Sequence, residues 1–128
     1  MEEKNKSNME NKICKFENLS AWKKSKELAI FSYGVTAKMP KKEMFGLISQ
    51  INRAAVSLAA NIVEGCSRNT KKDFSHFLDI ALGSAFELKT LYEVAVSQKY
   101  ISRSELKEVN VRIVDCVKLV YGLKRSIK

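Results

Sequence analysis

Proline, glycine, cysteine and histidine are all scarce in this sequence. One proline and five glycines in 128 residues argue against a disordered or β-rich chain and favour a helical one. The glycines are isolated, so no glycine-rich phosphate loop is present. Cys14, Cys66 and Cys116 are odd in number and far apart, which argues against a disulfide framework. A structural zinc site needs about four ligands, and with a single histidine we expect no metal and no other cofactor.

The sequence also lacks a long uncharged apolar run. Its most apolar stretch, residues 45–65, is interrupted by Gln50, Asn52, Arg53 and Glu64, and is therefore not a membrane-spanning candidate. The N-terminal residues are polar and mixed in charge, without the apolar core of a signal peptide. We expect a single domain located in the cytoplasm, with no membrane contact.

Positive charge is what the sequence has in excess, with a formal net charge of +9. Residues 1–42 carry ten basic and five acidic side chains, residues 43–101 carry six of each, and residues 102–128 carry seven and three. The excess therefore belongs to the two ends of the chain. Such a field raises encounter rates with polyanions and adds a salt-dependent affinity. It favours RNA or DNA as a partner, the alternative being a charge that serves solubility alone.

The hydrophobic pattern predicts four long helices, over residues 19–38, 42–65, 71–98 and 103–126. Pro40 separates the first two, and Thr70 with Asp73 and Ser102 with Glu105 form capping boxes for the last two. The fourth helix has an apolar seam with the spacing of bundle packing: Leu106, Val109, Ile113, Cys116, Val120, Leu123 and Ile127. The connections are short, so we expect an all-α, up-down-up-down four-helix bundle over residues 16–128, after a disordered tail over residues 1–15.

The second predicted helix carries a narrow polar stripe opposite its broad apolar face: Gln50, Arg53, Ser57, Asn61 and Glu64. A surface helix normally spreads lysine and glutamate over a wide polar face. The thin stripe therefore indicates a helix covered on most sides, whose polar groups need partners. We interpret it as a buried structural network that fixes the register of helices or of subunits, with Gly65 ending the helix. Catalysis by Glu64 would need a cleft and a second acid–base group, and the sequence identifies neither.

The second and third helices carry more apolar surface than one bundle seam needs. Residues 80–86 are uncharged all the way round the third helix. The surplus favours self-association into a homo-oligomer. The alternative is a thick core in which Leu82 or Phe86 is covered by the N-terminal tail.

The candidate phosphate contacts are basic side chains of the first and fourth helices and of the loop after the first. Four of them lie within about 80° on the fourth helix, opposite its apolar seam, and form a positive ridge. Such like charges repel one another unless a polyanion relieves them. No aromatic platform or recognition helix accompanies the ridge, so base-specific readout is not expected. The candidates are Lys23, Lys24, Lys26, Lys41, Lys42, Arg103, Lys107, Lys118 and Arg125.

Several motifs follow one another in a fixed register. F-x-x-L-x-x-W begins at Phe16, P-x-x-E-x-F-G-L begins at Pro40, and Q-I-x-R-A-A-V-S-x-x-A-N-I-x-E-G begins at Gln50. The pattern continues through Arg68, Phe74, Phe77, Leu78, Ile80, Ala81, Gly83, Ser84, Glu87 and Leu88. Over residues 16–125 it resembles the bacterial four-helix bundle family, also called ribosomal RNA intervening-sequence proteins. Leu58 and Ala59 replace an isoleucine–proline pair common in that family, so its proline kink is not expected here.

This resemblance implies a homopentameric ring of four-helix bundles with a positively charged surface. Some members are encoded within insertions in large-subunit ribosomal RNA genes. A related branch accompanies the reverse transcriptases of diversity-generating retroelements and binds both the enzyme and nucleic acid. The family has no established enzymatic site, so no catalytic residue is carried over. Its motif residues are interpreted as structural or assembly residues: Gln50, Arg53, Ser57, Asn61, Glu64, Gly65, Arg68, Gly83, Ser84 and Glu87.

Three hypotheses follow for function. The first is a non-enzymatic, cytoplasmic, homopentameric bundle that binds RNA or DNA through phosphate contacts. The second is a protein-interaction scaffold, such as an accessory subunit for a reverse transcriptase, whose charge serves electrostatic steering. The third and weakest is an enzyme, for example a nuclease, that uses Glu64 or His76.

Overall fold

The computed structural model describes residues 16–17 and 19–127, and it is all helical over that part of the chain. Four long helices account for most of it: α2 (Ser20–Thr36), α3 (Leu47–Cys66), α4 (Lys71–Ser97) and α5 (Arg103–Ser126). A short 3₁₀ helix, η1 (Lys41–Glu43), precedes α3. The predicted all-α class is therefore confirmed. The tail predicted over residues 1–15, which includes Cys14, lies outside the described residues.

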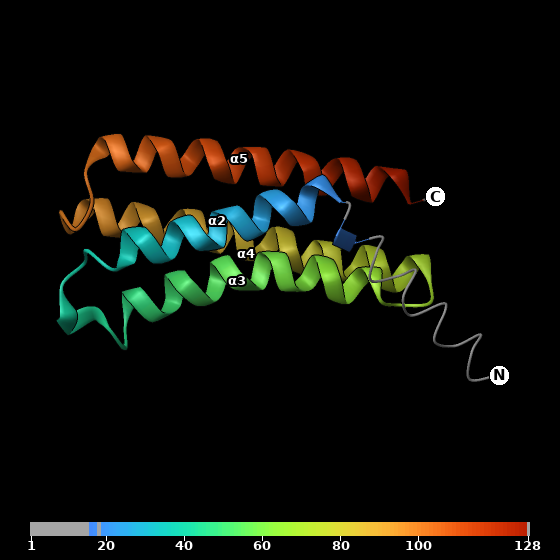
Figure 1. Cartoon of the computed structure of the whole chain (residues 1–128), viewed down its shortest axis with the longest axis horizontal. Helices are drawn as coiled ribbons and strands as arrows, with labels where there is room; N and C mark the ends of the chain where they lie inside the picture. The colour runs from blue at the N-terminus through green and yellow to red at the C-terminus, as the bar shows by residue number, and fades with distance from the viewer. Residues whose placement is uncertain (1–15, 18, 128) are drawn as a thin grey trace.

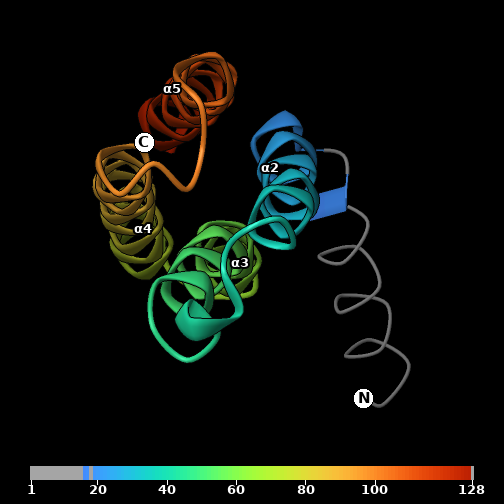
Figure 2. The same cartoon turned by 90° about the vertical axis from the view of Figure 1, so that its left-hand side faces the viewer.

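The helices lie side by side along one long axis (Figure 1). The α2–α3 and α4–α5 connections lie at one end of the molecule, and the α3–α4 connection lies at the other. Seen from the end, α2, α3, α4 and α5 follow one another around the core, and α5 also contacts α2 (Figure 2). None of these described helices is both long enough and apolar enough to cross a membrane.

The first residues of α4 and α5 are determined by capping side chains next to them in the sequence. Thr70 caps α4 by accepting a hydrogen bond on Oγ1 from the backbone N–H of Asp73, at 3.1 Å. Ser102 and Glu105 form a complete capping box at the start of α5. Each cap satisfies backbone N–H groups that have no partner within the helix. The helices consequently begin at the residues that the capping signals predict.

The start of α3 differs from the prediction of one helix over residues 42–65. Residues 41–43 form η1 instead, and Gly46 is the N-cap of an α-helix that begins at Leu47. The Glu43 carboxylate accepts hydrogen bonds from the backbone N–H of Leu47, at 3.3 Å, and from the Tyr100 hydroxyl, at 2.8 Å. Glu43 thus caps α3 from outside it and ties it to the α4–α5 loop.

The prediction that Gly65 ends its helix is also wrong. Gly65 lies inside α3, which continues to Cys66, and it has no left-handed backbone conformation. A Cβ atom at this position would lie 2.9 Å from Phe74 Cδ1, 3.0 Å from Phe77 Cβ and 3.1 Å from the Phe74 carbonyl oxygen. The glycine is therefore needed because α4 approaches the α3 backbone this closely.

The core lies between the four helices and contains the predicted apolar faces of α3 and α5. Tyr92 of α4 is the largest fully buried side chain, and it crosses the core to donate a hydrogen bond to Ser32 Oγ of α2 at 2.7 Å. Burial raises the pKa of Tyr92 to about 12, so its hydroxyl remains a donor at neutral pH. Other fully buried side chains include Leu28, Ile51, Leu58, Ile62, Leu78, Leu88, Val109 and Val120.

Candidate nucleic-acid interface

The four basic side chains predicted to form a ridge on α5 are all exposed. They do not make a continuous row. Arg103 and Lys107 lie near the start of α5 and Lys118 and Arg125 near its end, about 16 Å of helix separating Lys107 from Lys118. Two apolar side chains occupy the exposed surface between the two pairs: Val111, which is 55% exposed, and Val114, which is 46% exposed.

The three candidate lysines of α2 are exposed as well, but two of them have neighbours that engage the charge. Lys24 Nζ lies 3.6 Å from Glu27 Oε2, and Lys26 Nζ lies 4.9 Å from the centroid of the Trp22 ring. Both contacts are at the surface, where an ion pair or a cation–π contact contributes less than about 1 kcal/mol. A phosphate could displace either of them.

The groove between α2 and α5 is a poor site for a phosphate backbone. Its cavity of about 550 Å³ is lined by three basic and three acidic side chains. Their charges sum to zero, so the field that attracts a polyanion cancels there. The charged lining residues are Lys24, Glu27, Lys107, Glu108, Arg112 and Asp115. Phosphate contact is therefore favoured on the outer faces of α2 and α5.

The end of the molecule that carries η1 has a second group of cations. Lys41 and Lys42 are exposed on η1, and Lys99 is exposed in the α4–α5 loop. The acids near them already serve the fold. Glu43 accepts the two hydrogen bonds described above, and Glu105 caps α5 and pairs with Lys38 Nζ at 3.0 Å. Those contacts, the backbone hydrogen bond to Ser102 first, lower the pKa of Glu105. Within the described chain, neither acid is left to pair with the three cations.

The polar stripe of α3 was predicted to form a buried network between helices or between subunits. Within the described chain only part of it is hydrogen-bonded to a neighbouring helix. Its middle is hydrogen-bonded: Asn61 Nδ2 donates to Ser57 Oγ at 2.9 Å, and the Ser57 and Ser84 hydroxyls lie 2.9 Å apart, joining α3 to α4. Its ends are exposed. Gln50 and Arg53 are exposed, and Arg53 forms no ion pair with the described residues.

The remaining motif residues lie around the joined α3 and α4 helices. Arg68 pairs with Glu64 one turn earlier, and its guanidinium carbon lies 4.7 Å from the centroid of the Phe77 ring. Gly83 and Glu87 are exposed on α4. The motif therefore includes a tight α3–α4 contact at Gly65 and Ser84, and an exposed part in which Arg53 and Glu87 form no ion pair with the described residues.

Groups with catalytic chemistry are not brought together in the described residues. His76 is exposed, with its ring 5.6 Å from that of Phe77. Cys116 is buried in the α5 seam, and burial raises the pKa of its thiol, which favours a packing role over a nucleophilic one. No group of three or more metal-binding side chains is found in the same part of the chain.

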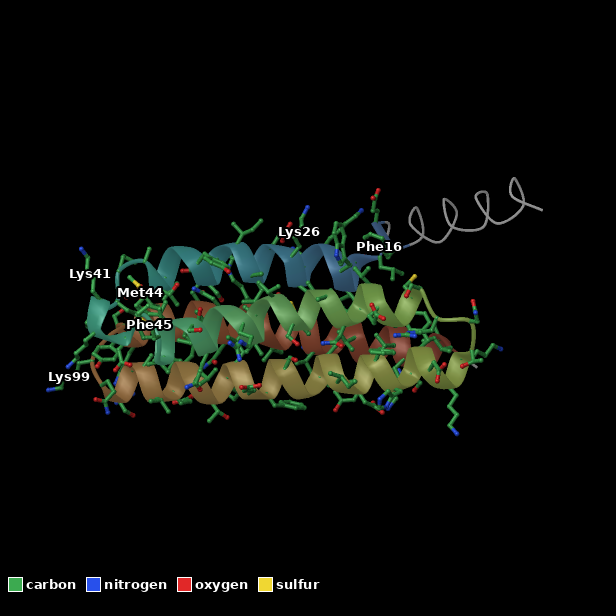
Figure 3. All side chains as sticks on the ribbon, turned by 90° about the horizontal axis from the view of Figure 1, so that it is seen from below. Phe16, Lys26, Lys41, Met44, Phe45 and Lys99 are labelled. Carbon is green, nitrogen blue, oxygen red and sulfur yellow. The ribbon has the colours of Figure 1, made fainter. Side chains whose placement is uncertain are left out.

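Sequence reasoning missed the most exposed aromatic side chain of the described residues. Phe45 is 94% exposed at the end of the molecule, beside Met44, which is 50% exposed (Figure 3). The sequence analysis placed Phe45 within an apolar helix. The sequence did carry a signal for the exposure of Phe45: Lys41 and Lys42 precede it and Gly46 follows it, and such residues are typical of a surface turn.

These observations define an all-α protein with four long helices and many exposed basic side chains. A family model described as 23S rRNA-intervening sequence protein matches residues 17–122. The chain belongs to this family. A similar crystal structure is that of a protein with unknown function from the S23 ribosomal protein family of Bacteroides thetaiotaomicron VPI-5482. The two chains are 26% identical, with a TM-score of 0.76, and the match covers 82% of this chain and 95% of the other. No curated protein matches the chain.

Proposed function

We propose that this protein is a non-enzymatic, cytoplasmic nucleic-acid-binding protein that contacts phosphates through its nine candidate lysines and arginines. The observation that carries the proposal is that these cations are exposed and mostly without acidic partners. All nine are exposed, and only Lys24 forms an ion pair with the described residues. Exposed cations without acidic partners keep their charge available to a polyanion and release its counterions on binding.

RNA is the first ligand to test. The name of the family refers to an intervening sequence of 23S rRNA, which favours an RNA ligand without identifying one. The cations are spread over α2, η1 and α5, so they would contact phosphates along a surface rather than read base edges. Preference for a structured RNA over a duplex DNA of equal length would then come from shape.

Salt dependence tests the proposal. Affinity for a structured RNA, measured by fluorescence anisotropy, should fall linearly in log Kobs against log[salt], because each phosphate contact releases counterions. If about six of the nine cations make contacts, the affinity falls by roughly 10³-fold between 50 and 200 mM salt. Absence of binding at 50 mM salt, or binding that salt does not weaken, would contradict the proposal.

We also propose that the chain is an up-down-up-down bundle that assembles into a homopentameric ring. The support is apolar surface that remains outside the core, on α3 at Val56 and on α4 at Ile80, Phe86 and Val94. Leu82, by contrast, is buried. Apolar side chains that a chain does not cover itself are typical of assembly surfaces.

Light scattering coupled to size-exclusion chromatography tests the assembly. We expect a particle of five times the chain mass of 14.5 kDa. A single 14.5 kDa species at micromolar concentration would refute the ring, and another multiple would refute the pentamer alone.

A protein-interaction scaffold, such as an accessory subunit for a reverse transcriptase, is the second candidate. Its support is the surface depression on α5 that includes Val111 and Val114, whose charged lining residues are the basic Arg103 and Lys107 and the acidic Asp115. Apolar side chains beside a net positive charge suit an acidic protein surface. Capture of a defined reverse transcriptase that survives nuclease treatment, and is lost in Val114→Glu, would favour this function over the first.

A further inference from the structure

The end of the molecule formed by η1 and the α4–α5 loop combines an exposed apolar tip with unpaired cations. Phe45 and Met44 project there beside Lys41, and Lys99 lies at the same end (Figure 3). Lys42 and Phe45 are three residues apart, at most about 11 Å along the chain. Single exposed apolar side chains are common on protein surfaces, but a nearly fully exposed phenylalanine among lysines is not explained by packing.

Two side-chain contacts join the segments at this end. The Tyr100 hydroxyl donates a hydrogen bond to Glu43 Oε2, and Lys38 Nζ lies 3.0 Å from Glu105 Oε2. The first contact joins the α4–α5 loop to η1, and the second joins the end of α2 to the start of α5. The segment that carries Phe45 is therefore tied to the α4–α5 loop, which brings Phe45 and Lys99 to the same end of the molecule.

The backbone conformation of Lys99 is a second, independent observation at this end. It has a φ of 64°, in the left-handed region, and is the only non-glycine residue with positive φ in the described chain. The N–H of Tyr100 bonds to the carbonyl of Ala95, and the N–H of Lys99 to that of Val96, which is the hydrogen-bond pattern of a Schellman helix end. Glycine is the favoured residue at that position, so packing and backbone geometry do not account for a lysine there.

We infer that this tip binds unpaired nucleotides: the Phe45 ring stacks on an exposed base, while Lys41, Lys42, Lys99 and Arg103 contact the neighbouring phosphates. Every base has a flat face, so a single phenyl ring gives affinity for loops and single strands without sequence preference. The inference rests on the proposed nucleic-acid binding and adds the class of ligand, which is unpaired RNA rather than a closed duplex.

The experiment compares two RNA probes, a hairpin with an unpaired loop and a blunt duplex of the same length, at one salt concentration. Phe45→Ala should weaken hairpin binding by about 5- to 150-fold, the range for loss of one stacked base, and leave duplex binding unchanged. Lys99→Gly should weaken hairpin binding several-fold while the thermal midpoint stays equal or rises, so unfolding cannot explain the loss. Tyr33→Ala is the matched control, because Tyr33 is an aromatic side chain that is 54% exposed on α2, and its variant should bind both probes like the parent protein.

Each alternative gives a different result. If the parent protein binds both probes and Phe45→Ala binds them equally well, the stacking role is overturned while the proposed function survives. If the parent protein binds neither probe, the proposed function fails first. A change in particle mass for Phe45→Ala, with both probes weakened equally, would make Phe45 an assembly contact. Binding of the parent protein to vesicles of anionic lipid, lost in Phe45→Ala and without hairpin preference, would identify a membrane ligand and overturn the inference.

Discussion

Replacing Lys107, Lys118 and Arg125 of α5 together by glutamine is expected to lower the affinity for a structured RNA by roughly 10²- to 10³-fold at 100 mM salt. The three side chains are exposed and have no ion-pair partner among the described residues, so their charges are available to phosphates. Each lost phosphate contact lowers the affinity about eightfold at this salt concentration, because the counterions of that phosphate are no longer released on binding. Glutamine keeps a strong helix former at each position, so α5 should remain folded.

A variant of α4 with the same change in charge serves as a control. It distinguishes the loss of phosphate contacts on α5 from the effect of a lower net charge on the whole protein. Lys71, Lys72 and Lys89 are also exposed, and their replacement by glutamine removes three positive charges from another helix. We expect the α4 variant to lose less than about tenfold in affinity, through the weaker overall field alone. Equal losses in the two variants would show that the protein attracts RNA by net charge, without a binding surface on α5.

The second large effect is expected at Gly65. Gly65→Ala should lower the free energy of unfolding by about 2 kcal/mol, because the added methyl group meets the Phe74 carbonyl and the Phe77 Cβ at 3.0–3.1 Å. The obstructing atoms belong to the α4 backbone and to the base of a side chain, so relief requires the two helices to move apart. Urea unfolding followed by circular dichroism, at one fixed protein concentration, measures the change.

Gly34→Ala is the matched control for that substitution. Gly34 also lies inside a helix, α2, but a Cβ atom there would meet nothing within 4 Å. The same methyl group should therefore raise the free energy of unfolding by about 0.5–1 kcal/mol, through helix propensity. Opposite signs for the two variants would confirm that close approach, rather than helix propensity, selects glycine at position 65. Two stabilised variants would contradict the account of α3–α4 packing.

Helix positions could be predicted from the sequence where the determining contacts are local. Thr70 and Ser102 lie within three residues of the groups they cap, so α4 and α5 begin where the sequence indicates. The start of α3 could not be predicted in this way. It depends on Glu43, which also accepts a hydrogen bond from Tyr100, 57 residues away in sequence.

The polar stripe of α3 shows a second limit of periodicity. Helical spacing correctly places Arg53, Ser57 and Asn61 on one side of the helix. It does not reveal which part of that side a neighbouring helix covers. Of the stripe residues, Ser57 is the one that bonds to Ser84 of α4, whereas Gln50, Arg53 and Glu64 at the two ends are exposed. Arg53 lies on the same side as Ser57 but is exposed and forms no ion pair with the described residues.

The sequence predicted which basic residues are exposed but not how they are arranged on the surface. Exposure of Lys107 and Lys118 follows from their position opposite the apolar seam of α5. The same reasoning does not indicate that Val111 and Val114 interrupt the row, nor that the α2–α5 groove is neutral. Phe45 was misplaced because an apolar residue before a helix resembles the start of its buried face. In the structure Phe45 lies in the turn before α3, whose N-cap is Gly46.

The slope of log Kobs against log[salt] for a structured RNA, compared between the parent protein and the α5 triple variant, tests the central claim most directly. The claim is that this protein binds nucleic acid through phosphate contacts, three of which are made by Lys107, Lys118 and Arg125. Loss of three contacts should make the slope shallower by about 2.7, at about 0.9 for each contact. Parallel lines for the two proteins, whatever their separation, would contradict the claim.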